Sequence, residues 1–440
     1  MLAVVVSRAD SASEHVGEHL LELASWTEHE DDTRADGKGG GTYYRTDGIE
    51  LRTFDDLHLH LDGVAAAFDD PEMLVFASRH SGDTGPLLTA HATGNFGPAE
   101  YGGGEGSLAR AAPNALKVVR HAFDDHAPDR YDTGVECTHH GPSTVGCPSL
   151  FVELGSDEEQ WADPAGAEAV ARSILDLRGV NPTADRAVVG FGGNHYAPRF
   201  DRILTETDWG VGHIAANWAL EEMGDPTDSW AVLTKAFRAS GTKYALIDGG
   251  HPDLGGVIDE LGFETVSETW LRETTGVDLE LVEQLEGELS TVDEGLRFGD
   301  PATEHEGGFV VEEAPEELLE EANGINSDAA DAIAADVLAY ETLEGASLVG
   351  DRVALASAGD YRDIVNDLAA VLEAKYDTVE VGDEAVVARR EAFDPDLARE
   401  AGVEEGPAFG RLSAGESVEV RGETVTPDDV RSARERRFPF

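Results

Sequence analysis

The stretch Met73-Leu74-Val75-Phe76-Ala77-Ser78-Arg79-His80-Ser81 joins an apolar strand pattern directly to a histidine. The same order recurs at Gly134-Val135-Glu136-Cys137, which leads into Thr138-His139-His140-Gly141-Pro142. It recurs again at Val188-Val189-Gly190-Phe191, which leads into Gly192-Gly193-Asn194-His195. Short apolar runs of this kind predict buried strands of an α/β fold, in which ligands bind outside the carboxyl ends of the strands. We therefore expect four histidines from distant parts of the chain to meet at one sheet edge.

The regions around these motifs alternate between strand and helix patterns. Strands are expected at residues 2–6, 73–77, 134–138, 150–154, 187–191 and 244–247. Apolar residues at helical spacing predict helices at 11–24, 107–124, 157–176 and 227–239, with Ser11 and Thr227 as caps. Pro113 and Pro164 fall inside two of these ranges and could delay the start of each helix. The pattern predicts an α/β fold with a mixed, largely parallel sheet flanked by helices.

Histidine and tryptophan are unevenly distributed along the 440 residues. Fourteen of the 15 histidines lie at or before His251, and all six tryptophans lie at or before Trp270. A chain of this length is too long for one ordinary core. We expect a catalytic domain over residues 1–270. Residues 271–440 should hold an acidic connector and a smaller C-terminal α+β domain, with strands at 353–356 and 378–381 around a helix at 361–375. The acid-rich stretch at about 271–330 could be a helical connector or already part of the second domain.

The net charge of -57 arises from 89 acidic and 32 basic residues. Such self-repulsion strains a compact protein in dilute salt, but at molar salt the Debye length shrinks to roughly 3 Å. The acids are spread along the whole chain and form no single tail, which favours adaptation to a salt-rich cytoplasm. Acidity of this origin does not exclude a nucleic-acid partner.

The first six residues are apolar but too short for a signal peptide, and no run approaches the ~20 apolar residues of a membrane span. We therefore expect a cytoplasmic protein without membrane contact, and a monomer. In that compartment Cys137 and Cys147 should be reduced thiols.

Several histidines and two carboxylates are candidates for one metal site. A lone histidine at a strand end is more often a hydrogen-bonded surface group than a ligand, but its recurrence at His80, His139, His140 and His195 strengthens the signal. His91 and His213 join this set, and the remaining early histidines are interpreted as surface groups: His15, His19, His29, His58, His60, His121 and His126. Glu136 and Glu153 could be zinc ligands or could hold an imidazole in place through a salt bridge.

Two glycine-rich stretches and the cysteines suggest other sites. Residues 37–41 are expected to form a flexible loop, and residues 102–106 a plain loop, with a phosphate site at a helix start as the alternative for 102–106. Residues 102–106 lack the Lys-Ser/Thr ending of a P-loop. A Cys–His nucleophile at Cys137 or Cys147 is possible. The chain contains no Gly-x-Ser-x-Gly elbow and no His-Glu-x-x-His motif.

Several motifs together resemble one family. Ser78-Arg79-His80, His91-Ala92-Thr93-Gly94-Asn95, Tyr101-Gly102-Gly103, Thr138-His139-His140-Gly141-Pro142 and Gly193-Asn194-His195-Tyr196-Ala197-Pro198 resemble, in order and spacing, the archaeal D-aminoacyl-tRNA deacylases, a family shared with plants. The resemblance covers roughly residues 1–270. It implies hydrolysis of the ester joining a D-amino acid to tRNA, dependence on zinc, and a peptidyl-tRNA hydrolase/phosphorylase-like α/β fold.

The residue pattern and the resemblance together give the expected site. The catalytic groups should be His80, His139, His140, His195 and Glu136, and the Zn²⁺ ligands should come from His80, His91, His139, His195 and Glu153. Contacts to the D-aminoacyl-tRNA substrate are expected from Thr93, Asn95, Gly102, Gly103 and Tyr196. Which groups bind metal and which move protons stays open. Two other functions also stay open: a zinc hydrolase of another small acyl or amide substrate, and a tRNA-binding factor without catalysis.

Overall fold

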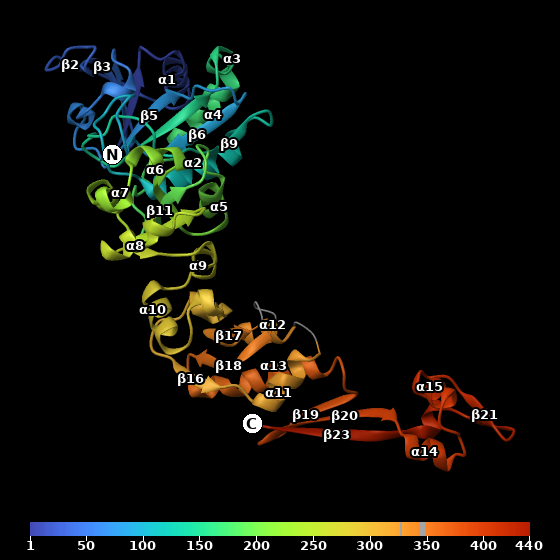
Figure 1. Cartoon of the computed structure of the whole chain (residues 1–440). Coiled ribbons are helices and arrows are strands. Elements are labelled where there is room, and N and C mark those ends of the chain that lie inside the picture. The colour runs from blue at the N-terminus through green and yellow to red at the C-terminus, as the bar shows by residue number, and fades with distance from the viewer. Residues whose placement is uncertain (326–327, 344–347) are drawn as a thin grey trace. The chain divides into compact units, whose positions relative to one another are not determined.

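A computed structural model describes residues 1–325, 328–343 and 348–440 and divides the chain into two compact units (Figure 1). Unit 1 is Met1–Thr275 and unit 2 is Gly276–Phe440. The structure therefore breaks the chain shortly after the last tryptophan, Trp270, and after all histidines except His305. Within the described ranges, no helix is both long enough and apolar enough to cross a membrane.

An eight-stranded mixed sheet forms the frame of unit 1, with the order β2-β3-β4-β1-β5-β10-β6-β9. Its centre consists of β1 (Leu2–Ser7), β5 (Met73–Arg79) and β10 (Ser149–Gly155), which run parallel and are buried almost throughout. These are the continuous apolar runs of the sequence, as expected for strands covered on both faces. The strands around them are β2 (Thr27–Asp31), β3 (Gly41–Thr46), β4 (Ile49–Phe54), β6 (Leu87–His91) and β9 (Asp132–Val135).

A second, parallel sheet in unit 1 has the order β12-β11-β13-β14. Its strands are β11 (Ala187–Gly192), β12 (Gly210–Ala215), β13 (Tyr244–Asp248) and β14 (Glu264–Thr265). The strands that precede His139 and His195 therefore belong to different sheets, and the expectation of one common edge was wrong. The periodicity of the sequence predicts that a segment is a strand. Which other strands it pairs with depends on contacts between residues that are distant in sequence.

Helices cover the sheets of unit 1, and prolines set two of their starts. α2 (Pro113–His126) and α4 (Pro164–Leu175) each begin at the proline, because proline fits the first helical turn and cannot donate a backbone hydrogen bond further in. The helix predicted at residues 107–124 was therefore wrong at its start. Residues Ser107–Leu108 form strand β8, which pairs with β7 (Gly94–Asn95). The other helices are α1 (Ser11–Leu23), α3 (Glu158–Trp161), α5 (Pro198–Glu206), α6 (Asn217–Met223), α7 (Trp230–Ser240), α8 (Pro252–Glu260) and α9 (Glu268–Glu273).

The residues predicted as caps, Ser11 and Thr227, do not cap α1 and α7. The Asp10 carboxylate accepts hydrogen bonds from the backbone of Ala12 and Ser13 at the start of α1. Asp225 accepts from the Thr227 backbone but caps the short 3-10 helix Pro226–Asp228, whereas α7 follows Ser229 without a side-chain cap. Both predicted caps were therefore wrong: Asp10, one residue before Ser11, reaches the free N–H groups of α1, and Thr227 lies inside a separate short helix.

Unit 2 has an α+β architecture. A four-stranded antiparallel sheet has the order β15-β17-β18-β16, and a three-stranded antiparallel sheet has the order β19-β20-β23. The strands are β15 (Leu296–Phe298), β16 (Val310–Glu313), β17 (Ala339–Leu343), β18 (Leu348–Leu355), β19 (Thr378–Val381), β20 (Ala385–Phe393), β21 (Val418–Val420), β22 (Glu423–Val425) and β23 (Arg431–Pro439). The helices are α10 (Leu279–Glu288), α11 (Glu316–Asn323), α12 (Asp328–Ala334), α13 (Tyr361–Leu372), α14 (Pro395–Glu400) and α15 (Pro407–Ser413).

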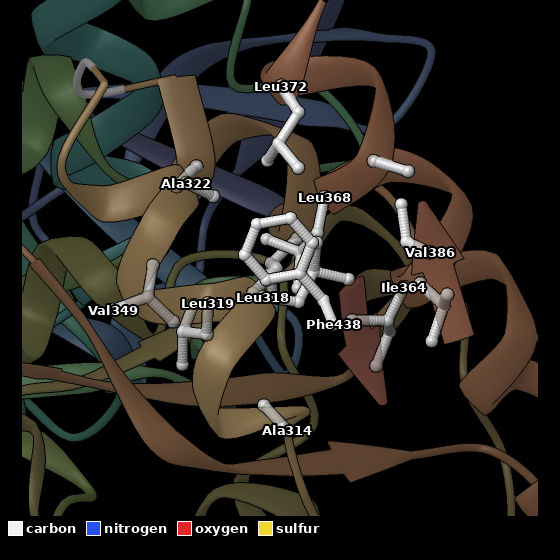
Figure 2. Close-up of a cluster of buried hydrophobic side chains, with 14 of the residues drawn as sticks. Ala314, Leu318, Leu319, Ala322, Val349, Ile364, Leu368, Leu372, Val386 and Phe438 are labelled. Carbon is white, nitrogen blue, oxygen red and sulfur yellow. The ribbon is translucent and has the colours of Figure 1, made fainter. Parts of the chain in front are cut away.

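The core of unit 2 joins its helices to both sheets. Leu318 and Leu319 of α11 pack in one buried cluster with Leu368 of α13 and with Phe438 of β23 (Figure 2). The acid-rich stretch after residue 271 contributes α11 and β15 to this unit, so it is part of the second domain and not a separate connector.

Candidate active site

The segment after β9 brings the ends of the two sheets of unit 1 together. The Glu136 N–H donates to the Ala90 carbonyl in the first sheet at 3.1 Å. The next residue, Cys137, donates to the His195 carbonyl at 2.8 Å, and Thr138 donates to the Ile214 carbonyl of the second sheet at 2.8 Å. These hydrogen bonds place His139 and Glu136 beside His195, although the residues come from different sheets.

Three histidines lie with their rings in contact: His91, His139 and His140. Their ring centroids are separated by 4.4 to 4.9 Å. Each ring uses Nδ1 to donate to a backbone carbonyl, since a carbonyl can only accept. The acceptors are Ala92 at 3.0 Å, Cys137 at 2.8 Å and Gly141 at 2.8 Å. The proton of each ring therefore lies on Nδ1, and the Nε2 atom carries the lone pair that can bind a cation.

Burial keeps this cluster suited to a cation. The ring of Phe151 stacks on the ring of His91 with 5.2 Å between the ring centroids, and its centroid lies 4.7 Å from that of His140. Burial lowers the pKa of His139 well below its usual value and lowers the pKa of His140 to about 4, so both rings are neutral at neutral pH. The buried Nε2 of His91 makes no hydrogen bond to any described residue and lies 3.6 Å from a Glu153 oxygen.

Two fully buried carboxylates, Glu136 and Glu153, lie next to this cluster. Glu136 pairs with His80 Nδ1 at 2.9 Å and accepts a hydrogen bond from His195 Nε2 at 2.8 Å. Burial opposes the charged form of His80, but the two carboxylates outweigh it and raise the pKa of His80 to about 10. Burial would also raise the pKa of Glu136, yet the hydrogen bonds from His195 and His80 hold that pKa well below its usual value. His80 is therefore a cation between two anions.

The pKa of His91 is shifted by the same carboxylates. Burial alone would lower it, but Glu153 raises the pKa of His91 above its ordinary value. A bound cation would satisfy Glu153 in place of a proton on this ring, because opposite charges near a carboxylate favour its charged form in the same way.

The cysteines do not form an activated nucleophile. Cys137 Sγ lies 3.5 Å from His195 Nδ1, but burial raises the pKa of this thiol to about 12. Reactive cysteines instead have lowered pKa values and partial exposure. Cys147 is buried in the core beneath the first sheet, where burial raises its pKa to about 11. Both thiols are free, as expected.

Two cavities open onto the cluster, and both are lined by Tyr101, His139 and His195. The smaller, of about 220 Å³, is also lined by Phe96 and Trp218. The larger, of about 480 Å³, is more polar and is also lined by Asp10, His58, Arg79, His80 and Glu153. His139 and His195 thus lie where a substrate could extend to either side.

Of the residues expected to contact substrate, Asn95 alone is among the described residues that line these two cavities. Thr93 is buried and its hydroxyl donates to the carbonyls of His140 and Pro142, so it holds the turn that carries the histidines. Asn95 lines the smaller cavity and donates to the Gly102 carbonyl at 2.9 Å. Tyr196 is exposed, and its hydroxyl lies 3.4 Å from His80 Nε2.

Gly102 and Gly103 form a tight loop beside Asn95. Both have left-handed backbone, with φ of +79° and +76°, which favours glycine. A Cβ on Gly103 would approach Ser143 Oγ at 3.0 Å. The phosphate-site alternative for residues 102–106 was wrong, because α2 begins only at Pro113 and offers this loop no helix start.

Two histidine assignments were also wrong. His213 is fully buried away from the cluster, where its Nδ1 contacts Thr138 Oγ1 at 3.0 Å and its Nε2 donates to the Ala109 carbonyl at 2.8 Å. His58, expected at the surface, is buried and lines the larger cavity beside Asp10. No apolar strand precedes His58 in the sequence, so the strand-then-histidine pattern could not find it.

Three groups of described residues have ligand atoms within 4.8 Å of one another and could hold a metal ion. They are His91 with His139 and His140, Cys137 with His139 and His195, and His80 with Glu136 and Glu153. The first group alone consists of three imidazoles whose Nδ1 atoms are all held by backbone carbonyls, which is the arrangement that orients metal-binding imidazoles. In the third group, His80 Nδ1 is already engaged by Glu136.

Comparison with known proteins identifies relatives of this chain. A family model described as D-aminoacyl-tRNA deacylase matches residues 67–258. The D-aminoacyl-tRNA deacylase of Natronomonas pharaonis is 68% identical and that of Haloarcula marismortui is 50% identical, each over the whole of both chains. A crystal structure of a conserved protein of unknown function is 30% identical, covers 62% of this chain and 98% of its own, and superposes with a TM-score of 0.55. The chain thus belongs to the D-aminoacyl-tRNA deacylase family.

Proposed function

We propose that unit 1 hydrolyses the ester bond of D-aminoacyl-tRNA and releases the free D-amino acid and tRNA, with a zinc ion held by His91, His139 and His140. Family membership supports the reaction and the tRNA substrate. The geometry supports the metal through one observation: three backbone carbonyls take up the Nδ1 protons and leave three Nε2 lone pairs together. Three nitrogen ligands with one open position are typical of catalytic zinc.

The buried, unsatisfied Nε2 of His91 supports the fit of a cation. A buried polar atom without a partner costs about 1–3 kcal/mol, so native structures rarely leave one unmatched. Histidine nitrogen suits zinc, copper, iron and nickel better than magnesium or calcium, and the absence of redox partners in the proposed hydrolysis favours zinc. When bound, zinc lowers the pKa of water towards ~7 and polarises an ester carbonyl.

The remaining groups are assigned to proton handling. His195 donates from Nε2 to Glu136, lies at the meeting point of the two cavities and is about one-third exposed. A carboxylate behind an imidazole fixes its tautomer and stabilises its protonated form. We assign to His195 the transfer of a proton to the departing ribose oxygen, with Glu136 holding the ring in place. His80, as a cation, keeps Glu136 and Glu153 charged.

The shape of the site suits an ester with a bulky group on each side. One cavity is small and lined by aromatic residues, the other is larger and polar, and they meet at His139 and His195. An aminoacyl ester of tRNA has the amino acid on one side of the scissile bond and the terminal nucleotide on the other. The same argument gives no support to a factor that binds tRNA without catalysis.

The test is deacylation of matched D- and L-aminoacyl-tRNA in molar salt, before and after chelation. We expect the D-ester to be cleaved in preference to the L-ester, chelation to abolish turnover, and one equivalent of zinc to restore it. Full turnover by a metal-free preparation would contradict the metal assignment. Equal inactivity on both esters in the presence of bound zinc would contradict the proposed reaction.

A further inference from the structure

The paired strands β20 and β23 have a charge opposite to that of the whole chain. Together they carry six arginines and two glutamates, in a protein whose acids outnumber its bases by 89 to 32. The six are Arg389, Arg390, Arg431, Arg434, Arg436 and Arg437. Figure 1 shows the two strands side by side along their length, with β23 at the edge of the three-stranded sheet. Six of the chain's 32 basic residues therefore lie on this one strand pair.

The strand register places like charges against each other. Arg390 lies directly opposite Arg434 in the antiparallel pair, and Arg436 follows on the same face two residues later. Like charges at directly opposite positions destabilise a sheet. Among the described residues, neither Arg390 nor Arg434 forms an ion pair with a carboxylate; Arg434 donates only to the Phe393 carbonyl, at 3.5 Å. The repulsion is partly offset, since Arg434 attracts the Asp394 carboxylate and the Arg390 guanidinium lies 5.8 Å from the centroid of the Tyr376 ring.

Carboxylates do neutralise other arginines close by. Arg389 pairs with Glu380 at 3.0 Å and with Glu435 at 2.8 Å. Arg411 pairs with Glu416 at 3.0 Å. Arg437 is exposed on β23 and, like Arg390 and Arg434, has no carboxylate partner among the described residues. We call Arg390, Arg434 and Arg437 the arginine edge; Arg390 belongs to the central strand β20, and Arg437 lies on the opposite face of β23 from Arg434.

The arginine edge is held by the core of unit 2. Val386 of β20 and Phe438 of β23 are fully buried among Leu318, Ile364 and Leu368 (Figure 2). Next to Phe438, the Arg436 guanidinium pairs with the buried Glu321, which also accepts from Tyr376 at 2.8 Å. The guanidinium groups of the arginine edge therefore project from strands whose ends are fixed by packing.

We propose that the arginine edge binds the sugar–phosphate backbone of tRNA. Arginine presents a planar fork of donors that matches phosphate, and phosphate contacts supply most of the affinity of proteins for nucleic acids. In a protein of net charge -57, arginines without a carboxylate ion pair form a local positive surface that attracts a polyanion, whereas the acidic remainder of the chain repels it. The inference rests on the proposed function, which supplies the RNA, and assigns to unit 2 a contact with tRNA phosphates instead of with the ester.

The experiment compares two variants of the full chain with equal changes of charge. The first carries Arg390→Gln, Arg434→Gln and Arg437→Gln. The control carries Arg399→Gln, Arg411→Gln and Arg421→Gln, three exposed arginines of unit 2 that lie outside these strands. Circular dichroism in molar salt verifies folding, and fluorescence anisotropy with an uncharged tRNA transcript measures the Kd at several salt concentrations.

We expect the first variant to raise the Kd for tRNA on the order of tenfold. The slope of log K against log salt concentration should become shallower by about one for each phosphate that the variant no longer binds. The control should match the wild-type chain. The first variant should also raise KM for D-aminoacyl-tRNA without changing kcat on a D-aminoacyl ester of adenosine. Wild-type Kd and slope in the first variant, or an equal loss in the control, would overturn the proposal.

Two further results separate this inference from its alternatives. Unchanged tRNA binding with new self-association of the first variant would overturn it, and would assign the arginines to protecting an exposed edge strand. If the wild-type chain cleaves no D-aminoacyl ester but the first variant still loses tRNA affinity, the proposed reaction fails while the RNA surface stands. Binding and cleavage are measured separately for this reason.

Discussion

The two units place their nitrogen-bearing side chains in opposite environments. In unit 1, His91, His139 and His140 are packed together, and burial keeps His139 and His140 neutral. In unit 2, Arg434 and Arg437 are exposed on an edge strand, where a guanidinium stays charged. A neutral imidazole can bind a metal ion, whereas a permanent cation can bind phosphate. The two environments thus suit different partners: a metal ion for the three histidines of unit 1 and, in our proposal, the phosphates of tRNA for the arginines of unit 2.

The largest expected effect is a loss of kcat in unit 1, and zinc content then distinguishes the metal ligands from the proton-transfer group. His140→Ala and His195→Ala should each lower kcat by at least the ~10²-fold typical of losing such a role. Only His140→Ala should also lose zinc, because His140 contributes an Nε2 lone pair to the three-histidine group. Metal analysis and single-turnover deacylation check this, with His121→Ala on an exposed face of α2 as the control. Loss of zinc from His195→Ala with normal zinc in His140→Ala would reverse the assignment.

A smaller effect should appear in the acid stability of unit 1. Burial lowers the pKa of His213 to about 4 in the folded chain, below the value near 6.5 of an exposed histidine. The unfolded chain therefore binds the proton first, so the stabilisation is complete above about pH 6.5 and is lost as the pH falls towards 4, by up to ~1.4 kcal/mol per pH unit.

The measurement is denaturant unfolding at constant molar salt from pH 7 to 4.5. His213→Gln can donate to the Ala109 carbonyl and accept from Thr138 without titrating, so its free energy of unfolding should fall less steeply with acid than that of the wild-type chain. His29→Gln, on the surface strand β2, provides the matched control. Parallel pH profiles for all three proteins would contradict the buried neutral state of His213.

Apolar runs predicted the buried strands, and prolines predicted the starts of two helices. The buried strands β1, β5 and β10 follow continuous apolar segments, and β19 has the predicted bounds. Strands such as β2, whose residues are mainly exposed and polar, have no such pattern. The sequence also does not predict that the strands of unit 1 form two sheets that meet at the site. This arrangement depends on hydrogen bonds between residues far apart in sequence, such as the one from Thr138 to Ile214.

The histidine pattern located the site but not the role of each ring. His80, His139 and His195 converge on Glu136, as their positions after apolar strands indicated. His213 also lies on a strand, yet it packs inward on the Ala109 carbonyl. Roles depend on which nitrogen faces a backbone carbonyl, and this is set by local turns that sequence spacing does not describe.

The most direct test of the division between the units is deacylation by a truncated chain that ends at Thr275, in molar salt. All the groups assigned to chemistry lie in unit 1, so the truncated chain should fold, bind zinc and keep the wild-type kcat. Its KM for D-aminoacyl-tRNA should rise, because the arginine edge is gone; a raised KM with unchanged kcat marks weakened binding with intact chemistry. A truncated chain that is folded by circular dichroism and holds zinc, yet cleaves no D-aminoacyl-tRNA at any substrate concentration, would contradict this account.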